Sequence, residues 1–155
     1  MSNSVGTAIG PCETMLFRQI HPLLIKGGSP SRGAFLPGCE HEIEVGKSNF
    51  KPESGNDLST RHEDIGAEGA FLAHRASGLK TLGTWGFQVK EAAELGLSCH
   101  EDAGLGQPPA PEHHVTVMFP DVPDRKKERI ARSLKSCAAA HGRGGWLHGP
   151  VDPEA

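Results

Sequence analysis

The chain has 155 residues, a length typical of one domain. Leu, Ile, Val and Phe make up about a fifth of it, just above the level at which charged chains tend to be disordered. Glycine (20) and proline (12) are abundant, so much of the backbone should lie in turns and loops. No apolar run approaches the roughly 18 residues of a membrane span, and the net charge of −3 excludes a strongly basic nucleic-acid-binding domain.

The first ten residues lack the basic region and apolar stretch of a secretion signal. The four cysteines are scattered along the chain, which argues against a disulfide framework. We therefore expect reduced thiols, a cytoplasmic location and a single domain over residues 1–155. Residues 1–13 and 149–155 should form loose tails.

The first dense apolar run covers residues 15–20 and has the length of a strand. Residues 33–45 are expected to hold one or two short strands, centred on residues 34–36 and 43–45. Residues 46–58 are polar and carry Gly, Asn and Asp, which predicts a loop.

Thr60 and Glu63 have the spacing of a capping box, in which side chains bond the first amides of a helix. This pattern predicts a helix over residues 61–77. Residues 84–89 alternate between apolar and small or polar side chains, which is typical of a half-buried strand. Residues 90–96 predict a short helix that ends at a glycine.

Residues 101–112 are acidic and then rich in Gly and Pro, so they predict a surface loop. Residues 115–119 alternate and predict a second strand. The best helix of the chain should begin near residues 121–124, and residues 146–148 should form a last short strand. The helix carries a stripe of core-facing residues at helical spacing, namely Ile130, Leu134, Cys137, Ala138 and His141.

This order of elements predicts an α+β domain with a small mixed or antiparallel sheet and two main helices, closing with a strand–helix–strand unit. The last helix also carries a run of basic residues, Arg125, Lys126, Arg129, Arg132 and Lys135. Such a face binds phosphate, RNA or an acidic partner, although a solvated helix face needs charge in any case. Because the net charge is negative and no aromatic residue is interleaved, we expect an acidic protein partner rather than nucleic acid. The first functional prediction is a non-enzymatic interaction protein without a cofactor.

The alternative prediction is a small nucleotide-handling enzyme of the ADP-ribosyltransferase type that uses NAD. Arg18, Ser48 and Glu112 follow the order in which such enzymes place a phosphate-binding Arg, a Ser near the nicotinamide and a Glu at the ribose. His21 lies close to Arg18 and joins it and Glu112 as a candidate catalytic residue. A hydrogen-bonded strand end explains Arg18 and His21 equally well, and Glu112 is also explained as a loop acid.

Nine histidines raise the question of a metal site. The sequence places ligand-type residues together at 39–41, 99–100 and 113–114. No C-x-x-C or H-E-x-x-H pattern is present, however, and adjacent residues in a strand point to opposite faces. We predict no metal site.

His114 and Thr116 form one His-x-Thr motif, which two-histidine phosphoesterases use in pairs. In those enzymes each His is an acid or a base and each hydroxyl binds phosphate. No other histidine of this chain has Thr or Ser two residues later. We therefore expect His114 to be a strand histidine on a solvent face.

Several short words of the sequence occur together in one order. They are residues 17–22 (FRQIHP), 34–37 (AFLP), 83–89 (GTWGFQV), 111–114 (PEHH) and 145–147 (GWL). With these words the chain resembles a group of small uncharacterised bacterial α+β proteins that have no known activity. The resemblance implies a stand-alone bacterial domain and assigns no catalytic residue.

Overall fold

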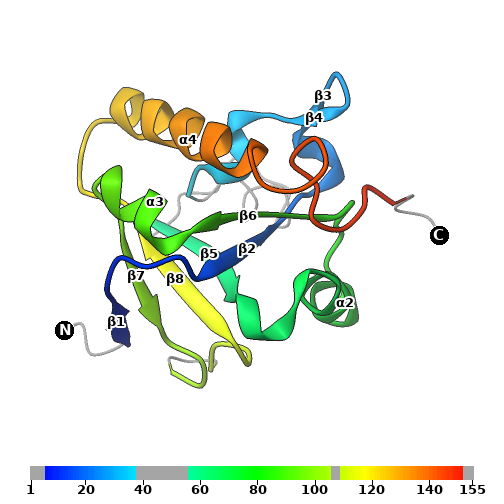
Figure 1. The fold of residues 1–155 in the computed structure, drawn as a ribbon, viewed down its shortest axis with the longest axis horizontal. Coiled ribbons are helices and arrows are strands. Elements are labelled where there is room, and N and C mark those ends of the chain that lie inside the picture. Colours follow the sequence, from blue (N-terminus) through cyan, green and yellow to red (C-terminus); the bar gives the residue numbers. More distant parts are fainter. Residues whose placement is uncertain (1–5, 38–55, 106–108, 152–155) are drawn as a thin grey trace, which may run out of the picture.

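The computed structural model describes residues 6–37, 56–105 and 109–151. Its centre is an antiparallel sheet of six strands in the order β1-β7-β8-β5-β2-β6 (Figure 1). The strands are β1 (Thr7–Ile9), β2 (Met15–Gln19), β5 (Asp57–His62), β6 (Thr84–Gln88), β7 (Ser98–Glu101) and β8 (His114–Met118). Two further strands, β3 (Ile25–Lys26) and β4 (Ser29–Pro30), form a separate small hairpin.

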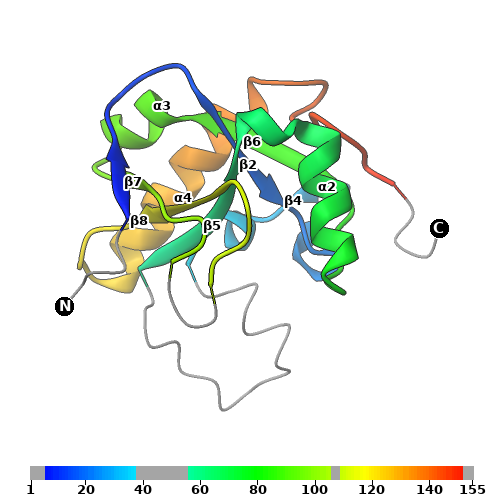
Figure 2. The same ribbon diagram turned by 90° about the horizontal axis from the view of Figure 1, so that it is seen from below.

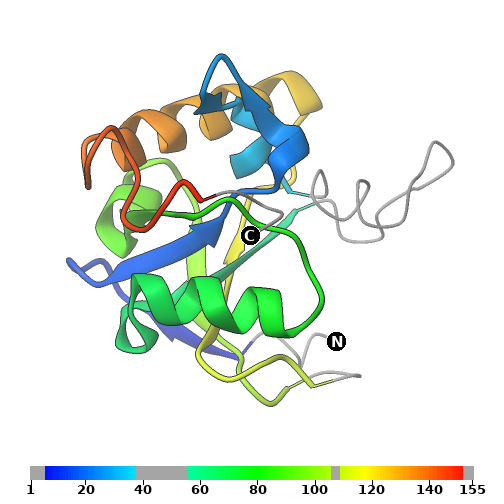
Figure 3. The ribbon, with the colours of Figure 1, turned by 90° about the vertical axis from the view of Figure 1, so that its right-hand side faces the viewer.

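The described helices are α2 (Ala67–Ala76), α3 (Val89–Glu94) and α4 (Asp124–Ala139). In Figure 1, α3 and α4 lie above the sheet and α2 lies below it. Figure 3 shows α4 and α2 on opposite sides of the strands. The predicted α+β class with an antiparallel sheet is thus confirmed.

The main apolar core lies on the α4 side of the sheet. Alternation along each strand sends one set of side chains to this side, as Val115 and Val117 of β8 show. The helix α4 contributes residues at helical spacing, namely Ala131, Leu134 and Ala138. The sheet and the turn before residue 37 contribute the larger side chains: Leu16, Ile20, Phe35, Leu58, Trp85, Phe87, Val115 and Val117.

The helix predicted over residues 61–77 is wrong in its first part. Residues 57–62 form β5, and α2 begins only at Ala67. The two residues of the apparent capping box are used by the sheet instead. Thr60 Oγ1 donates to the Val115 carbonyl at 2.8 Å, and Glu63 Oε1 accepts from the Met15 amide at 2.8 Å. Tertiary hydrogen bonds therefore replace the local ones that the spacing suggested.

The strand expected at residues 34–36 is also wrong. Arg32–Phe35 form a 3-10 turn, η2, which packs against α4 and buries Ala34 and Phe35 completely. The second expected strand, at residues 43–45, lies outside the described residues. A short apolar run has no periodicity that separates a buried turn from a strand.

Besides β5 and the hairpin of β3 and β4, two strands of the main sheet were missed. Thr7–Ile9, within the lead-in expected to be loose, forms β1 and pairs with Ser98–Glu101, which form β7. The predicted loop over residues 101–112 therefore begins one residue later. Both strands are short, β1 at the edge of the sheet and β7 next to it, so few alternating residues carry a signal.

The last helix begins at Asp124 as expected, but its core-facing stripe is narrower than predicted. Ile130, Cys137 and His141 are only partly buried. After α4 the chain returns to the sheet, where His148 forms an isolated antiparallel bridge with Thr84 instead of a full strand.

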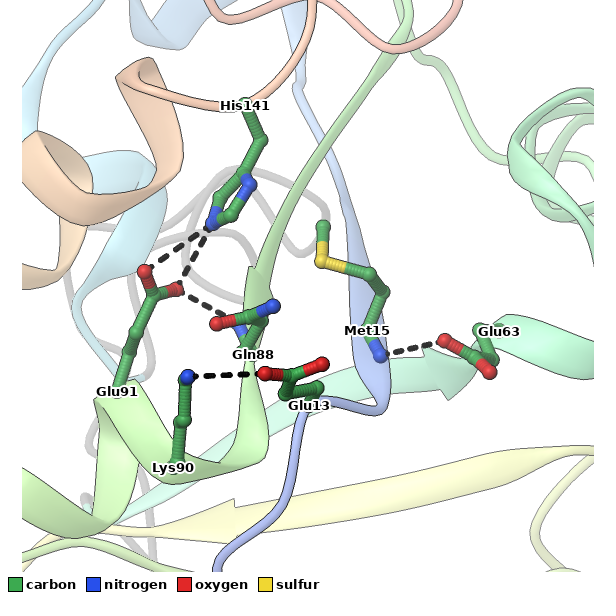
Figure 4. A network of polar contacts seen from close by, with 7 residues as sticks. All are labelled: Glu13, Met15, Glu63, Gln88, Lys90, Glu91 and His141. Carbon is green, nitrogen blue, oxygen red and sulfur yellow. Dashed lines mark hydrogen bonds and ion pairs between the residues drawn. The ribbon is translucent and has the colours of Figure 1, made fainter.

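A polar network ties the end of α4 to the start of α3 (Figure 4). His141 Nε2 lies 3.1 Å from both carboxylate oxygens of Glu91. Glu91 also accepts the Gln88 amide at 2.8 Å and so completes a capping box at the start of α3. One partly buried carboxylate therefore stabilises both a helix start and a contact between helices.

Candidate functional site

The second face of the sheet, on the α2 side, is polar where the core face is apolar. Registers place Arg61 opposite His114 and Ser59 opposite Thr116 on the neighbouring strands β5 and β8. His100 of β7 follows opposite Thr116. Since α2 packs on β2 and β6, the strands β5, β8 and β7 that carry this polar row lie beside the helix; Figure 2 shows these strands from below.

A split in the sheet lies next to the row. The strands β2 and β5 pair only at Leu16 with His62 and at Phe17 with Arg61. Beyond Phe17, the Arg18 side chain bridges β2 to other segments. Its Nη1 donates to the Ser59 carbonyl at 3.0 Å, and its Nε donates to the Ala34 carbonyl at 2.7 Å. Arg18 is only 4 % exposed, so its charge is buried at the split.

A pocket of about 210 Å³ lies at this place, between α2, the sheet and the loop that precedes β8. Its apolar wall consists of Phe17, Leu79 and Pro111. Its polar lining residues are Arg18, Gln19, Ser59, Thr60, Arg61, His74 and His114. Two arginines and two histidines thus line one small space.

Hydrogen bonds fix the α2 wall of the pocket to the sheet. Gln19 Nε2 donates to Thr84 Oγ1 at 2.8 Å, and Thr81 Oγ1 donates to Gln19 Oε1 at 2.9 Å. Thr84 Oγ1 in turn donates to the carbonyl of Ala67, the first residue of α2, at 3.0 Å. The buried polar chain holds the helix at a defined place over β2 and β6.

His114 is held by an aspartate from the loop after β7. Its Nδ1 lies 2.6 Å from Asp102 Oδ1, while Thr116 Oγ1 donates to Asp102 Oδ2 at 2.6 Å. The His114 and Asp102 side chains are only 13 % and 14 % exposed. An ionised carboxylate only accepts hydrogen bonds, so His114 carries a proton on Nδ1, and Nε2 is the nitrogen left for a ligand.

Arg61 supplies the second cation of the pocket. Burial lowers the pKa of its guanidinium from the ordinary value, because the charged form is partly removed from water. Its Nη1 makes one long hydrogen bond, 3.4 Å, to the Glu112 carbonyl. A partly desolvated guanidinium with a weak carbonyl contact is suited to binding an anion.

Of the described candidate residues of the enzyme prediction, only Arg18 lines the pocket, whereas His21 and Glu112 lie elsewhere. His21 is 5 % exposed, and its Nδ1 accepts the Leu23 amide at 3.1 Å, so it caps the turn η1 (Pro22–Leu24). The Glu112 side chain is exposed, and its main chain meets Arg61. Ser48 lies outside the described residues.

Sequence reasoning missed Arg61, His74 and Asp102 as members of a site. The His-x-Thr spacing of residues 114–116 was the only usable signal, because it places both side chains on one strand face. Asp102 joins them only through the register of β7 and β8. His114 lies on the α2-side face of its strand, but it is mostly covered rather than solvated.

The basic residues proposed as a partner surface lie on α4. Arg125, Lys126, Arg129 and Arg132 are exposed, and Lys135 is partly buried. They project from the helix whose Ala131, Leu134 and Ala138 pack on the core. This surface is on the opposite side of the sheet from the pocket.

Among the described residues, no group of three or more His, Cys, Asp or Glu is arranged to hold a metal ion. The ligand-type residues at 39–41 lie outside the described part. Burial, with a smaller effect of the neighbouring Cys12, raises the pKa of the Cys99 thiol to about 11. That thiol is therefore protonated at neutral pH.

No family model, curated protein or solved structure matches this chain. In the described part of the chain, no helix has the length and apolar character needed to cross a membrane.

Proposed function

We propose that the pocket between α2 and the sheet binds a small phosphate-bearing ligand of the nucleotide type and acts on it by acid–base chemistry. The observation that carries the proposal is the pair formed by Arg61 and the Asp102-bound His114, side by side in register at one pocket. The proposal develops the alternative prediction of a nucleotide-handling enzyme. It retains Arg18 as part of the site and leaves Glu112 at the margin.

The charge of the pocket supports an anionic ligand. Arg18 and Arg61 both line it, and the described lining contains no Asp or Glu side chain. Two carbonyls engage Arg18, so we assign the direct phosphate contact to Arg61. A guanidinium forms paired, charge-assisted hydrogen bonds with phosphate oxygens, which are stronger than neutral ones.

The hydrogen bonding of His114 supports a chemical role rather than binding alone. Asp102 fixes its tautomer and ring orientation, and Thr116 fixes Asp102. A histidine held in this way presents Nε2 as a proton acceptor at a set position. Because two arginines line the pocket and NAD carries phosphate groups, an NAD-type dinucleotide is among the ligands to be tested.

The test is a titration of the purified protein with nucleoside monophosphates and with NAD, followed by melting temperature and calorimetry. Binding to the folded state should raise the melting temperature. Replacement Arg61→Met should weaken binding about tenfold or more, since hydrogen bonds to a charged group contribute about 1.5–3 kcal/mol. The matched control Arg129→Met, on α4, should bind like the wild type. Absence of any shift at millimolar nucleotide, or equal affinity of Arg61→Met, would contradict the proposal.

We further propose, on a separate observation, that the basic surface of α4 contacts an acidic protein partner. Four of its five basic side chains are exposed. These positive side chains are complementary in charge to carboxylate-rich surfaces, and this contact needs no cofactor.

A fluorescent poly-glutamate peptide serves as the probe of the α4 surface. The variant Arg129→Glu/Arg132→Glu/Lys135→Glu should lose binding, whereas Lys80→Glu at an exposed site away from α4 should keep it. Binding by the wild type should weaken as salt rises, because exposed charges are screened. Undiminished binding by the triple variant at low salt would sink the proposal.

A further inference from the structure

We infer that the pocket cleaves ribonucleotide phosphodiesters with two histidines, His114 as the base and His74 as the acid. The inference rests on the proposed function, since the phosphate must first bind beside Arg61. It goes further by naming a bond to be cleaved and a second catalytic group.

The two histidines line the pocket from different elements. His114 comes from β8, and His74 comes from the last turn of α2. The chain holds a single His-x-Thr motif. The tertiary structure supplies the second histidine from a helix, where no strand motif would reveal it.

The surroundings of the two rings assign different roles to them. Asp102 accepts the Nδ1 proton of His114, so Nε2 has a lone pair that can take a proton. His74 lies near the C-terminus of α2, where the partial negative charge of the helix interacts favourably with an imidazolium. In the reaction that we infer, His114 accepts a proton and His74 donates one.

The reaction is an intramolecular transfer. His114 Nε2 takes the proton of the substrate 2′-hydroxyl, and the 2′-oxygen forms a bond to phosphorus. The bond from phosphorus to the 5′-oxygen breaks, and the His74 imidazolium gives its proton to that leaving oxygen. The products are a 2′,3′-cyclic phosphate and a 5′-hydroxyl, so protons and charge balance. Arg61 stabilises the charge that develops on the phosphate oxygens.

The size of the pocket favours this kind of substrate. At about 210 Å³ it is smaller than the roughly 300–1,000 Å³ of typical small-molecule sites. A phosphodiester and an adjoining ribose would enter it while the bases stay outside. A nucleophile within the substrate also suits the described lining, which offers cationic and imidazole groups and no carboxylate. Little preference for base sequence is expected.

The experiment compares a fluorescent RNA oligonucleotide with DNA of the same sequence. RNA should be cleaved to products that end in a 2′,3′-cyclic phosphate, identified by mass spectrometry. DNA should remain intact, because it lacks the 2′-hydroxyl. The rate should follow a bell-shaped dependence on pH, since one histidine must be neutral and the other protonated.

Histidine variants connect the activity to the pocket. His114→Asn and His74→Asn should each lower the cleavage rate by about 10²–10⁴-fold, and each should remove one limb of the pH profile. His100→Asn serves as the matched control, because His100 lies on the same sheet face outside the pocket lining. It should cleave like the wild type, and melting curves should show that all three variants are folded.

The outcomes separate the two proposals. Nucleotide binding that depends on Arg61, without RNA cleavage, overturns the inference and leaves the proposed function standing. Absence of nucleotide binding overturns both. If a histidine variant fails to fold, wild-type products decide: cleaved DNA, or RNA products without a cyclic phosphate, contradict the inference.

Discussion

The two sides of the sheet are built from the same strands and have opposite characters. On the α4 side, Val115 and Val117 of β8 are fully buried in an apolar core. On the α2 side, the intervening His114 and Thr116 bind Asp102 and lie beside Arg61. One side is stabilised by packing, which is not directional, and the other by hydrogen bonds of defined geometry. The core side can therefore provide stability while the other side keeps polar groups for chemistry.

The difference between the two sides also explains which strands α2 does not cover. This helix packs on β2 and β6, and α4 packs on β6 and the turn η2. The polar row of β5, β8 and β7 has no comparable apolar helix face against it in the described residues. Burying charged side chains under such a face would cost more than packing could return.

The largest expected contrast is between two neighbours on β5. Leu58→Ala should lower the free energy of unfolding by about 2–5 kcal/mol, because it leaves a cavity in the core. Ser59→Ala, at an exposed position on the other face, should change it by less than about 0.5 kcal/mol. Urea denaturation of both variants measures the difference. Equal losses would show that the two faces contribute alike to stability.

A smaller loss is expected at the polar network on the α4 side. Glu91→Ala removes both the cap of α3 and the contact with His141, and it should cost about 1–2 kcal/mol. Glu94→Ala, exposed on the same helix, is the control and should be nearly neutral. A neutral Glu91→Ala variant would mean that this network does not stabilise the helix pair.

On the α2 side, Asp102→Asn should separate stability from function. The amide still accepts one of the two hydrogen bonds, so the expected cost in unfolding free energy is about 1 kcal/mol. The cleavage rate should fall much more and its pH profile should move, because the His114 tautomer is no longer fixed. Asp121→Asn, at an exposed position, should leave both quantities unchanged. Loss of activity only in proportion to lost stability would argue against a positioning role for Asp102.

The smallest effect at neutral pH concerns Cys99, which packs in the core. Burial, followed by the neighbouring Cys12, raises the pKa of its thiol from 9.0 to about 11. The unfolded chain therefore loses this proton at lower pH than the folded protein does. The contribution of Cys99 to stability is complete below pH 9 and is lost as the pH rises towards about 11. Between pH 9 and about 11 the free energy of unfolding, measured by denaturation at each pH, should fall less steeply with pH for Cys99→Ala than for the wild type. The same pH dependence in both proteins would contradict the assignment.

Particular residues show how far the sequence alone could lead. The alternation over residues 84–89 and 115–119 correctly predicted the strands β6 and β8, and the spacing in the last helix correctly predicted α4. Thr60 and Glu63 misled, because a Thr and a Glu three residues apart fit a helix start as well as a strand end. Only their partners, Val115 and Met15, distinguish the two cases.

The sequence by itself determined the class of this fold, the strands β2, β6 and β8, and the polar character of one strand face, because side-chain periodicity is a local property. The tertiary structure alone decided that Arg18 bridges a split between β2 and β5, that Asp102 holds His114 and that His74 reaches the same pocket. These contacts join residues far apart along the chain. They depend on strand register and helix placement, which the packing of the whole sheet sets.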